Sequence, residues 1–327
     1  MTITTLALLG LAFSLDLLLA EPRNAVHPVA WFGHFVGALD REWVETDRGQ
    51  RLVGVGIALA VPLVPALAAG GLVAFGLALD PLLGAVLAGL VLFVTISLRS
   101  LLELTETVLA ATDGDLETAR EKVRGLVGRD ASALSPAELR SAAVESAAEN
   151  LADGLVATLL PFALLAPLSL PAAAGVAAWV KGVNTLDSML GYPDKPHGTA
   201  SARLDDLVMW LPARVTAVAI AVAAGSPRAL WRARRWARAP PSPNSGWPMA
   251  TLACVLSVRL SKPGVYELNP EAPLPTVADG ERAVTIVGRA AVVAVLVAVA
   301  LAALSDAVAP TIASAATTTL ESMGVRA

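Results

Sequence analysis

The sequence has little charge and a single cysteine. Of its 327 residues, 16% are Asp, Glu, Lys or Arg and 55% are hydrophobic, whereas soluble domains usually carry about 25% charged residues. The lone Cys254 excludes an internal disulfide and a cysteine-based zinc site, so we expect it to be a packing residue. A basic tail of the kind that binds nucleic acid is also lacking. These absences favour a membrane protein over a soluble or nucleic-acid-binding one.

Several common catalytic motifs are missing as well. The sequence has no Gly-x-x-x-x-Gly-Lys-Ser/Thr phosphate loop, no Gly-x-Ser-x-Gly nucleophile elbow and no His-Glu-x-x-His metal motif. Thr2–Ala20 is apolar but lacks a basic start and a small-residue cleavage site. We therefore expect a retained first helix rather than a signal peptide.

The main feature of the sequence is a set of long uncharged stretches. The hydrocarbon core of a bilayer needs roughly 20 apolar helical residues, and the mean hydropathy of the chain is +0.65. With the first helix, these stretches predict about six membrane segments in a single all-α, polytopic membrane bundle over residues 1–327. The uncharged stretches are Val53–Leu79, Leu82–Leu98, Gly154–Val180, Val215–Pro227 and Ala290–Ser305.

The connections between these segments differ in length. Asp80-Pro81 predicts a tight turn and hence an antiparallel helix hairpin. Two long polar loop regions, 99–153 and 226–285, are expected to contain cytoplasmic loop helices, one of them solvated around residues 113–124.

One uncharged stretch, Gly154–Val180, contains three prolines, and proline interrupts the hydrogen bonds of a helix. The stretch is therefore either one kinked spanning helix or a Pro-broken, re-entrant hairpin. We favour the hairpin, which places Glu145–Asp153 and Lys181–Asp206 on one side of the membrane.

Two basic clusters, within 120–129 and 228–238, are both expected to be cytoplasmic because positive charge concentrates there. A re-entrant hairpin followed by one spanning helix would put the clusters on opposite sides. A half-span near Met249–Val258 or a non-spanning Leu207–Pro227 would remove this conflict.

Three acidic residues precede the proline-containing stretch at helical spacing. Glu145, Glu149 and Asp153 lie at i, i+4 and i+8, so they share one face of a helix. Like charges repel at this spacing, and a hard cation such as Mg²⁺ prefers oxygen ligands of this kind. Charge runs are usually solvated helix faces, but this one directly abuts a long apolar stretch. We therefore favour a functional site.

A second polar cluster follows the same stretch. Lys181, Asn184 and Ser188 share one helical face, and Asp187 lies on the adjoining face. A lysine at the end of an apolar helix often only extends its ammonium toward water. That explanation does not cover four polar groups together, and ionisable groups at a membrane boundary are usually functional.

Further candidates have two open interpretations each. Arg203 either neutralises Asp205 and Asp206 in a structural ion pair or binds phosphate. Arg129 follows Gly128 and is either part of a turn-borne ion pair or an anion contact.

The remaining polar candidates are single residues. A lone histidine such as His27 is more often structural than catalytic. Asn244 lies in a Ser-Pro-Asn loop that presents polar atoms, and Arg214, inside a candidate span, is expected to have a partner.

These motifs, in this order, resemble the CbiB family, which is called CobD in some aerobic bacteria. Three details depart from the family pattern: Ala20-Glu21-Pro22 replaces the usual Gly-Asp-Pro, the basic aromatic stretch after Tyr192 is altered, and the tail past Pro270 matches poorly. The matching segments are Asp16, Glu21-Pro22, His27–Val29, Val127–Asp130, Glu145–Gly154, Asn184–Tyr192, Ser201–Asp206, Pro212–Arg214 and Ser242–Asn244.

The resemblance implies a multi-pass protein of the cell membrane that acts as an adenosylcobinamide-phosphate synthase in cobalamin biosynthesis. Such an enzyme is an ATP-dependent acid–amine ligase that also needs Mg²⁺. It would join a corrinoid, adenosylcobyric acid, to (R)-1-amino-2-propanol or its O-phosphate. The resemblance implies the lipid bilayer and these substrates as partners, and no nucleic acid. The sequence leaves a homo-oligomer open.

Under this hypothesis the candidate residues take three roles. The catalytic residues are Glu149, Asp187, Lys181 and Asn184. The substrate-binding or phosphate-binding residues are Arg129, Arg203, His27, Ser188, Tyr192 and Asn244. The Mg²⁺ ligands are Glu145, Glu149, Asp153, Asp187, Asp205 and Asp206.

Two other functions are compatible with some of these features. A Mg²⁺-dependent membrane prenyl- or phospho-group transferase also uses aspartate clusters around a diphosphate. A transporter also combines broken helices with intramembrane polar groups. Against a transporter, no sequence repeat is visible, and the densest motifs lie beside the apolar stretches rather than within them.

Overall fold

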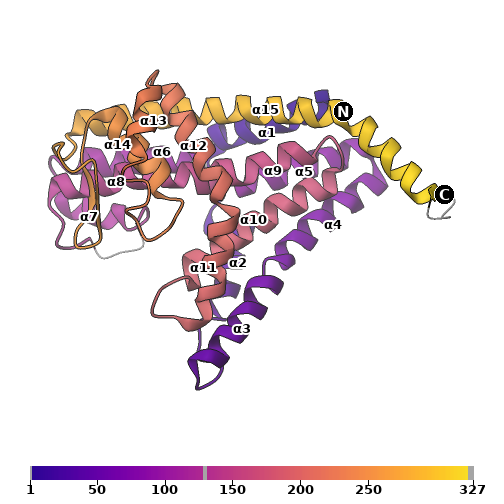
Figure 1. The fold of residues 1–327 in the computed structure, drawn as a ribbon, viewed down its shortest axis with the longest axis horizontal. Coiled ribbons are helices and arrows are strands. Elements are labelled where there is room, and N and C mark those ends of the chain that lie inside the picture. The colour runs from indigo at the N-terminus through magenta and orange to yellow at the C-terminus, as the bar shows by residue number, and fades with distance from the viewer. Residues whose placement is uncertain (1, 128–130, 323–327) are drawn as a thin grey trace.

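The computed structural model describes residues 2–127 and 131–322. Four helices, α1, α5, α9 and α15, pack side by side along the long axis of the molecule (Figure 1). The helices in chain order are α1 (Thr2–Leu19), η1 (Asn24–Val26), α2 (Pro28–Gly37), α3 (Asp47–Ala60), α4 (Leu63–Leu79), α5 (Pro81–Thr95), α6 (Leu98–Ala111), α7 (Leu116–Val123), α8 (Pro136–Leu151), η2 (Ala152–Val156), α9 (Ala157–Leu165), α10 (Leu170–Leu190), η3 (Pro196–Gly198), α11 (Thr199–Val208), α12 (Trp210–Ala223), α13 (Pro227–Ala233), α14 (Gly246–Leu256) and α15 (Val277–Ser322). Two short strands, β1 (Leu260–Lys262) and β2 (Tyr266–Leu268), precede α15.

The prediction of a polytopic all-α membrane bundle is confirmed. In the part of the chain that the structure describes, four helical stretches are long and apolar enough to cross a membrane. A bent pair, α11 and α12 with η3, would make five, compared with the expected number of about six. Two further apolar helices, Ile3–Leu19 and Gly246–Leu256, are shorter. The four stretches are Asp47–Leu79, Pro81–Ala111, Pro136–Leu165 and Val277–Pro310.

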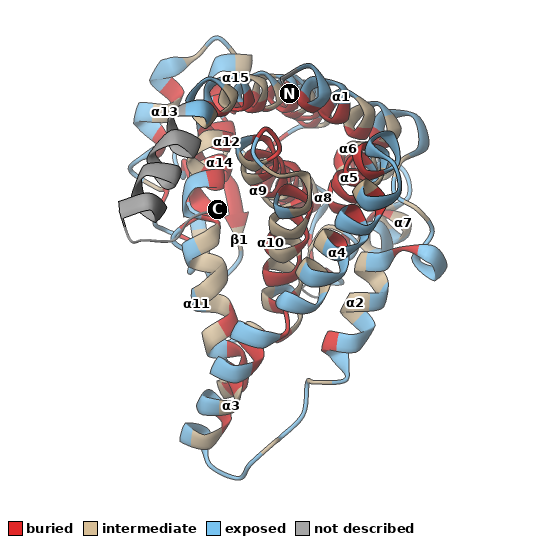
Figure 2. Ribbon diagram, turned by 90° about the vertical axis from the view of Figure 1, so that its right-hand side faces the viewer, coloured by how far each residue is buried: buried red, intermediate tan, exposed pale blue. Residues whose placement is uncertain are grey.

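The bundle presents apolar side chains outward. In Figure 2, exposed residues cover the outer faces of α4 and α1, and buried residues concentrate toward the interior. Leu67, Leu72, Phe75 and Leu79 on the outer face of α4 are between 47% and 73% exposed. Such a large exposed apolar surface is expected where helices face lipid.

The predicted turn at Asp80-Pro81 is confirmed. The Asp80 carboxylate accepts hydrogen bonds from the backbone N–H groups of Leu82 (2.8 Å) and Leu83 (3.0 Å) and so caps α5. Pro81 occupies the first turn of that helix, where its missing N–H costs nothing. The antiparallel α4–α5 pair follows from this local signal.

The expected hairpin in Gly154–Val180 is also present, but one of its three prolines does not break a helix. Pro161 lies inside α9, which continues α8 through the π-helical turn η2. The chain reverses at residues 166–169, and Pro171 begins α10. Because α10 returns alongside α9, Lys181 comes to interact with Asp153, as the hairpin predicted.

The direction of α11 and α12 determines where the two basic clusters lie in the molecule. These two helices run across α9 and α15 rather than along them (Figure 1). Consequently α7 and α13, which carry parts of the two clusters, both lie in the half of the molecule away from the α4–α5 turn. Because α11 and α12 together are also a candidate span, bent by 47°, the non-spanning Leu207–Pro227 stays a prediction.

The two polar regions are more regular than loops. Residues 99–111 continue α6, 136–153 lie mainly in α8, and 277–285 begin α15. The polar region 226–285 also forms an antiparallel hairpin in which Lys262 pairs with Tyr266. The Ser261 backbone N–H donates to Ser141 Oγ (2.8 Å), which fastens the hairpin to α8.

Candidate functional site

The acidic face of α8 opens into a cavity of about 400 Å³. Glu145 and Glu149 form one wall, Asp187 and Tyr192 at the end of α10 form another, and Lys262 of the β-hairpin lies across from them. The predicted meeting of the two polar clusters is therefore present in the fold. The full set of lining residues is Leu126, Val127, Glu145, Ser146, Glu149, Asp187, Ser188, Gly191, Tyr192, Lys262 and Tyr266.

The carboxylates of the two clusters act on one another electrostatically. Glu149 interacts with Glu145, Asp153 and Asp187, and these like charges are partly offset by Lys262. Asp187 also interacts with Asp206 on α11. The acids that the sequence places in three separate segments thus converge in one region.

The polar face of α10 provides the opposite charge. Lys181 interacts with Asp153 from one side and with Glu21 from the other. The Asn184 side chain, one turn further on, interacts with both Asp153 and Asp205. Asp153 lies in the π-helical turn η2, a feature that is frequent at functional sites because it redirects side chains.

Glu145 is held in place by two hydroxyl groups. Ser141 Oγ donates to its Oε1 (2.9 Å), and the Tyr266 hydroxyl donates to its Oε2 (2.7 Å). The side chain is 4% exposed. These contacts link α8 to the β-hairpin and position the carboxylate at the cavity wall.

His27 lies against Glu21 within the protein. Its Nδ1 accepts the Val29 N–H (3.1 Å), so the ring proton resides on Nε2, which faces Glu21 Oε1 at 3.6 Å. Burial alone would raise the pKa of Glu21, but the His27 contact and the Lys181 charge outweigh it and lower that pKa. The predicted substrate-binding role of His27 does not fit a ring that is 4% exposed and turned toward Glu21.

Asn244 is likewise occupied within the protein. It is 3% exposed, its Nδ2 donates to the Asp206 carbonyl (2.7 Å), and its Oδ1 accepts from Arg214. These contacts favour a structural role for Asn244, and its contact with substrate stays a prediction. Arg214 has the expected partner and also lies over the rings of Trp210 (4.8 Å) and Trp247 (5.4 Å).

The other predicted binding residues have mixed outcomes. Arg203 is 82% exposed and pairs with Asp206 at 3.8 Å, which favours the structural ion pair over a phosphate contact. Ser188 and Tyr192 line the cavity as expected. Arg129 lies outside the described residues.

The acidic cluster suits a Mg²⁺ ion carried by a nucleotide. Among the described residues, no group of three His, Cys, Asp or Glu side chains is arranged to hold a metal ion by itself. Mg²⁺ is usually bound through one or two carboxylates together with substrate phosphates and waters. Asp205 Oδ1 is buried without a hydrogen-bond partner in this part of the structure, as expected of an unused oxygen ligand.

Three residues of this region were not among the sequence candidates. Glu21 lies in a family motif but was not assigned to the site, although it interacts with Lys181. Lys262 and Tyr266 come from a short β-hairpin that no motif marked. The signal that could have indicated a hairpin there is Pro263-Gly264, a dipeptide typical of turns, which lies between Lys262 and Tyr266.

Comparison with known proteins agrees with these motifs. The family of CobD/Cbib proteins matches residues 9–295. The cobalamin biosynthesis protein CobD of Rhodobacter capsulatus is 38% identical over 308 residues, which cover 87% of this chain and 93% of the relative. The probable cobalamin biosynthesis protein CobD of Methanothrix thermoacetophila is 35% identical over 302 residues, covering 89% and 94%.

A third relative, the cobalamin biosynthesis protein CobD of Citrobacter koseri, is 33% identical over 293 residues and covers 84% of this chain and 88% of its own. Solved structures give no significant match. Because the family match spans most of the chain, this multi-pass membrane protein belongs to the CobD/CbiB family of cobalamin biosynthesis.

Proposed function

We propose that the protein is an ATP-dependent amide ligase that joins adenosylcobyric acid to (R)-1-amino-2-propanol or its O-phosphate. The observation that carries this proposal is the convergence of Glu149, Asp187 and Lys262 on one cavity at the end of the helix bundle. The family membership supplies the corrinoid pathway. A cavity that combines several acids with a lysine suits a substrate pair with phosphate groups and an amine.

The reaction needs an activated carboxylate because an oxide ion is a poor leaving group. The γ-phosphoryl group of ATP would pass to the propionate carboxylate, and ADP would leave. The amine nitrogen would then attack the acyl carbon, forming a C–N bond while the C–O bond to phosphate breaks. The ammonium form of the amine must first lose a proton, which a nearby carboxylate takes.

The residues of the cavity have distinct tasks in this scheme. Glu149 takes the proton of the ammonium group, since its carboxylate lines the cavity. Lys262, which also lines the cavity, binds phosphate oxygens, and Lys181 offsets the negative charge of Asp153. Asn184 orients Asp153 and Asp205 through its amide.

Asp187 and Asp205 would hold a Mg²⁺ ion together with nucleotide phosphates. When bound, such an ion neutralises the charge of the transferred phosphoryl group. These carboxylates interact with one another across the gap between α10 and α11, so a cation there relieves their repulsion.

The experiment mixes purified protein in detergent with adenosylcobyric acid, Mg·ATP and either aminopropanol phosphate or the free amine. We expect a product with the mass of the amide and one ADP released per amide. Glu149→Gln should lose turnover, whereas Glu117→Gln, an exposed acid on α7, should keep it. Amide formation without vesicles argues against a transporter. Absence of the amide with both amines, from protein that is folded, would reject the proposal.

A further inference from the structure

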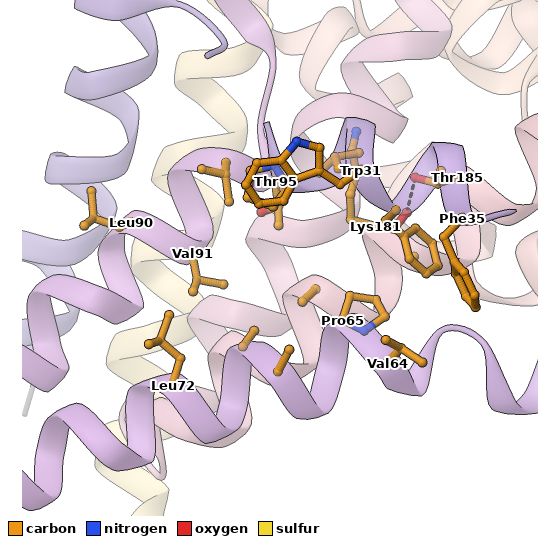
Figure 3. Close-up of a pocket in the computed structure, with 18 of the residues that line it drawn as sticks. Trp31, Phe35, Val64, Pro65, Leu72, Leu90, Val91, Thr95, Lys181 and Thr185 are labelled. Carbon is orange, nitrogen blue, oxygen red and sulfur yellow. Dashed lines mark hydrogen bonds between the residues drawn. The ribbon is translucent and has the colours of Figure 1, made fainter. Parts of the chain in front are cut away.

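A second cavity, of about 560 Å³, lies between α2, α4, α5 and α10 (Figure 3). Trp31 and Phe35 extend over it from α2, Pro65 and Leu72 line it from α4, and Val91 lines it from α5. Its lining is almost wholly carbon. This cavity is separate from the acidic one and has no role in the ligase scheme.

The few polar residues in this lining are already satisfied. The hydroxyl of Thr95 donates to the Leu92 carbonyl (2.8 Å), and that of Thr185 donates to the Lys181 carbonyl (2.8 Å). Lys181 interacts electrostatically with Glu21 and Asp153, which lie outside this lining. Apart from the end of the Lys181 side chain, the cavity therefore offers an apolar surface.

The cavity is positioned at mid-length in two candidate spans. Its α4 residues lie between Val64 and Leu72, within the stretch Asp47–Leu79, and its α5 residues lie between Leu87 and Thr95, within Pro81–Ala111. The rim residues remain open to the surroundings: Val64 is 53% exposed, Leu72 47% and Leu90 39%. The mouth of the cavity therefore faces the hydrocarbon layer of the membrane.

We propose that this cavity binds one acyl chain of a bilayer phospholipid. Water does not fill an apolar cavity favourably, because it would lose hydrogen bonds there. An empty cavity would forfeit the dispersion contacts of its lining. An acyl chain, present at high concentration at the open side, restores these contacts without cost in hydrogen bonding.

The bound chain has a consequence for the acidic cluster. Lys181 contributes to the wall of this cavity and also interacts with Asp153 of the other site. An acyl chain against Lys181 excludes water from one side of its side chain, and charges attract more strongly where water is excluded. The lipid therefore strengthens the Lys181–Asp153 contact. The inference itself does not depend on the ligase proposal.

The test fills the cavity from its open side. Ala68 lines the cavity and is exposed, so Ala68→Trp places an indole where the chain would bind without disturbing the core. Leu67→Trp is the matched control, because Leu67 is 73% exposed on the same helix and is not part of the lining. Ala68→Phe is a milder alternative if Ala68→Trp does not fold, as judged by size exclusion.

Each protein is purified in a steroid-based detergent, which has no alkyl chain, and its phospholipid is counted by native mass spectrometry. We expect the wild type and Leu67→Trp to retain one phospholipid more than Ala68→Trp or Ala68→Phe. Equal retention in all variants, or wild-type protein without phospholipid, would overturn the proposal. Retention of the corrinoid in place of lipid in this cavity would overturn it as well.

Discussion

Replacement of Asn244 distinguishes a structural role from a substrate contact. In the structure its amide donates to the Asp206 carbonyl and accepts from the Arg214 guanidinium. A neutral hydrogen bond is worth about 1 kcal/mol and one to a charged group about 1.5–3 kcal/mol, so Asn244→Ala should lower the free energy of unfolding by about 2.5–4 kcal/mol. The lower end of the range applies if Arg214 relies on its remaining contacts with the Trp210 and Pro243 carbonyls.

The assay follows unfolding in mixed micelles during an SDS titration, with tryptophan fluorescence as the signal. The matched control is Asn24→Ala, since Asn24 is exposed and its change should stay within about 0.5 kcal/mol. The KM for each substrate is measured for folded Asn244→Ala protein and should match that of the wild type. A variant with wild-type stability and a raised KM would show that Asn244 is free to bind substrate and would refute the structural assignment.

Three further outcomes follow from the cavity and the loops beside it. Lys262→Met should raise the KM for Mg·ATP about tenfold, the equivalent of about 1.4 kcal/mol, with kcat less affected, and an unchanged KM would remove its phosphate role. Asp187→Ala should lose amide formation while the protein still inserts and remains monodisperse, and wild-type turnover would discard its metal role. Asp40 accepts from Lys195 (2.5 Å), and this contact lowers the pKa of Asp40. Its stabilising effect is thus present above the unfolded-state pKa of about 4 and is lost as the pH falls through the lower folded-state value. Asp40→Asn should therefore weaken the loss of thermal stability at acid pH, and identical acid profiles would contradict this.

The Asp40 contact also explains why the loop after α10 has a defined shape. Lys195 and His197 both reach Asp40, at 2.5 Å and 3.2 Å, from the segment that departs from the family pattern. Tyr192, which lines the acidic cavity, lies under the Lys195 ammonium at 5.0 Å from its ring. Replacements in this loop are therefore expected to alter the position of Tyr192 and with it the shape of the cavity.

Parts of the site were predictable because they depend on spacing along one helix. Glu145 and Glu149 share a face of α8 as their separation of four residues requires, and both reach the same cavity. Lys181 and Asn184 lie on one side of α10 and meet Asp153. In each case the relevant geometry is set by the helical period, which the sequence states directly.

The contacts of other candidate residues were not predictable from the sequence. Asn244 is buried by Arg214 and Asp206, 30 and 38 positions away, and Arg203 turns outward. His27 lies against Glu21, and its ring nitrogen is used by a local backbone N–H. The sequence shows which side chains are polar, but it does not show which groups form their hydrogen bonds or ion pairs.

The sequence alone determined the class of the molecule, its family motifs, the α4–α5 turn at Asp80 and the acidic face of α8. These features follow from composition, local capping and helical period, all of which act within a few residues. Only the tertiary structure decided that α11 and α12 cross the bundle and that the β-hairpin brings Lys262 close enough to interact with Glu149. The position of the β-hairpin depends on packing between segments more than a hundred residues apart, such as Ser261 on Ser141, and such contacts leave no periodic trace in the chain.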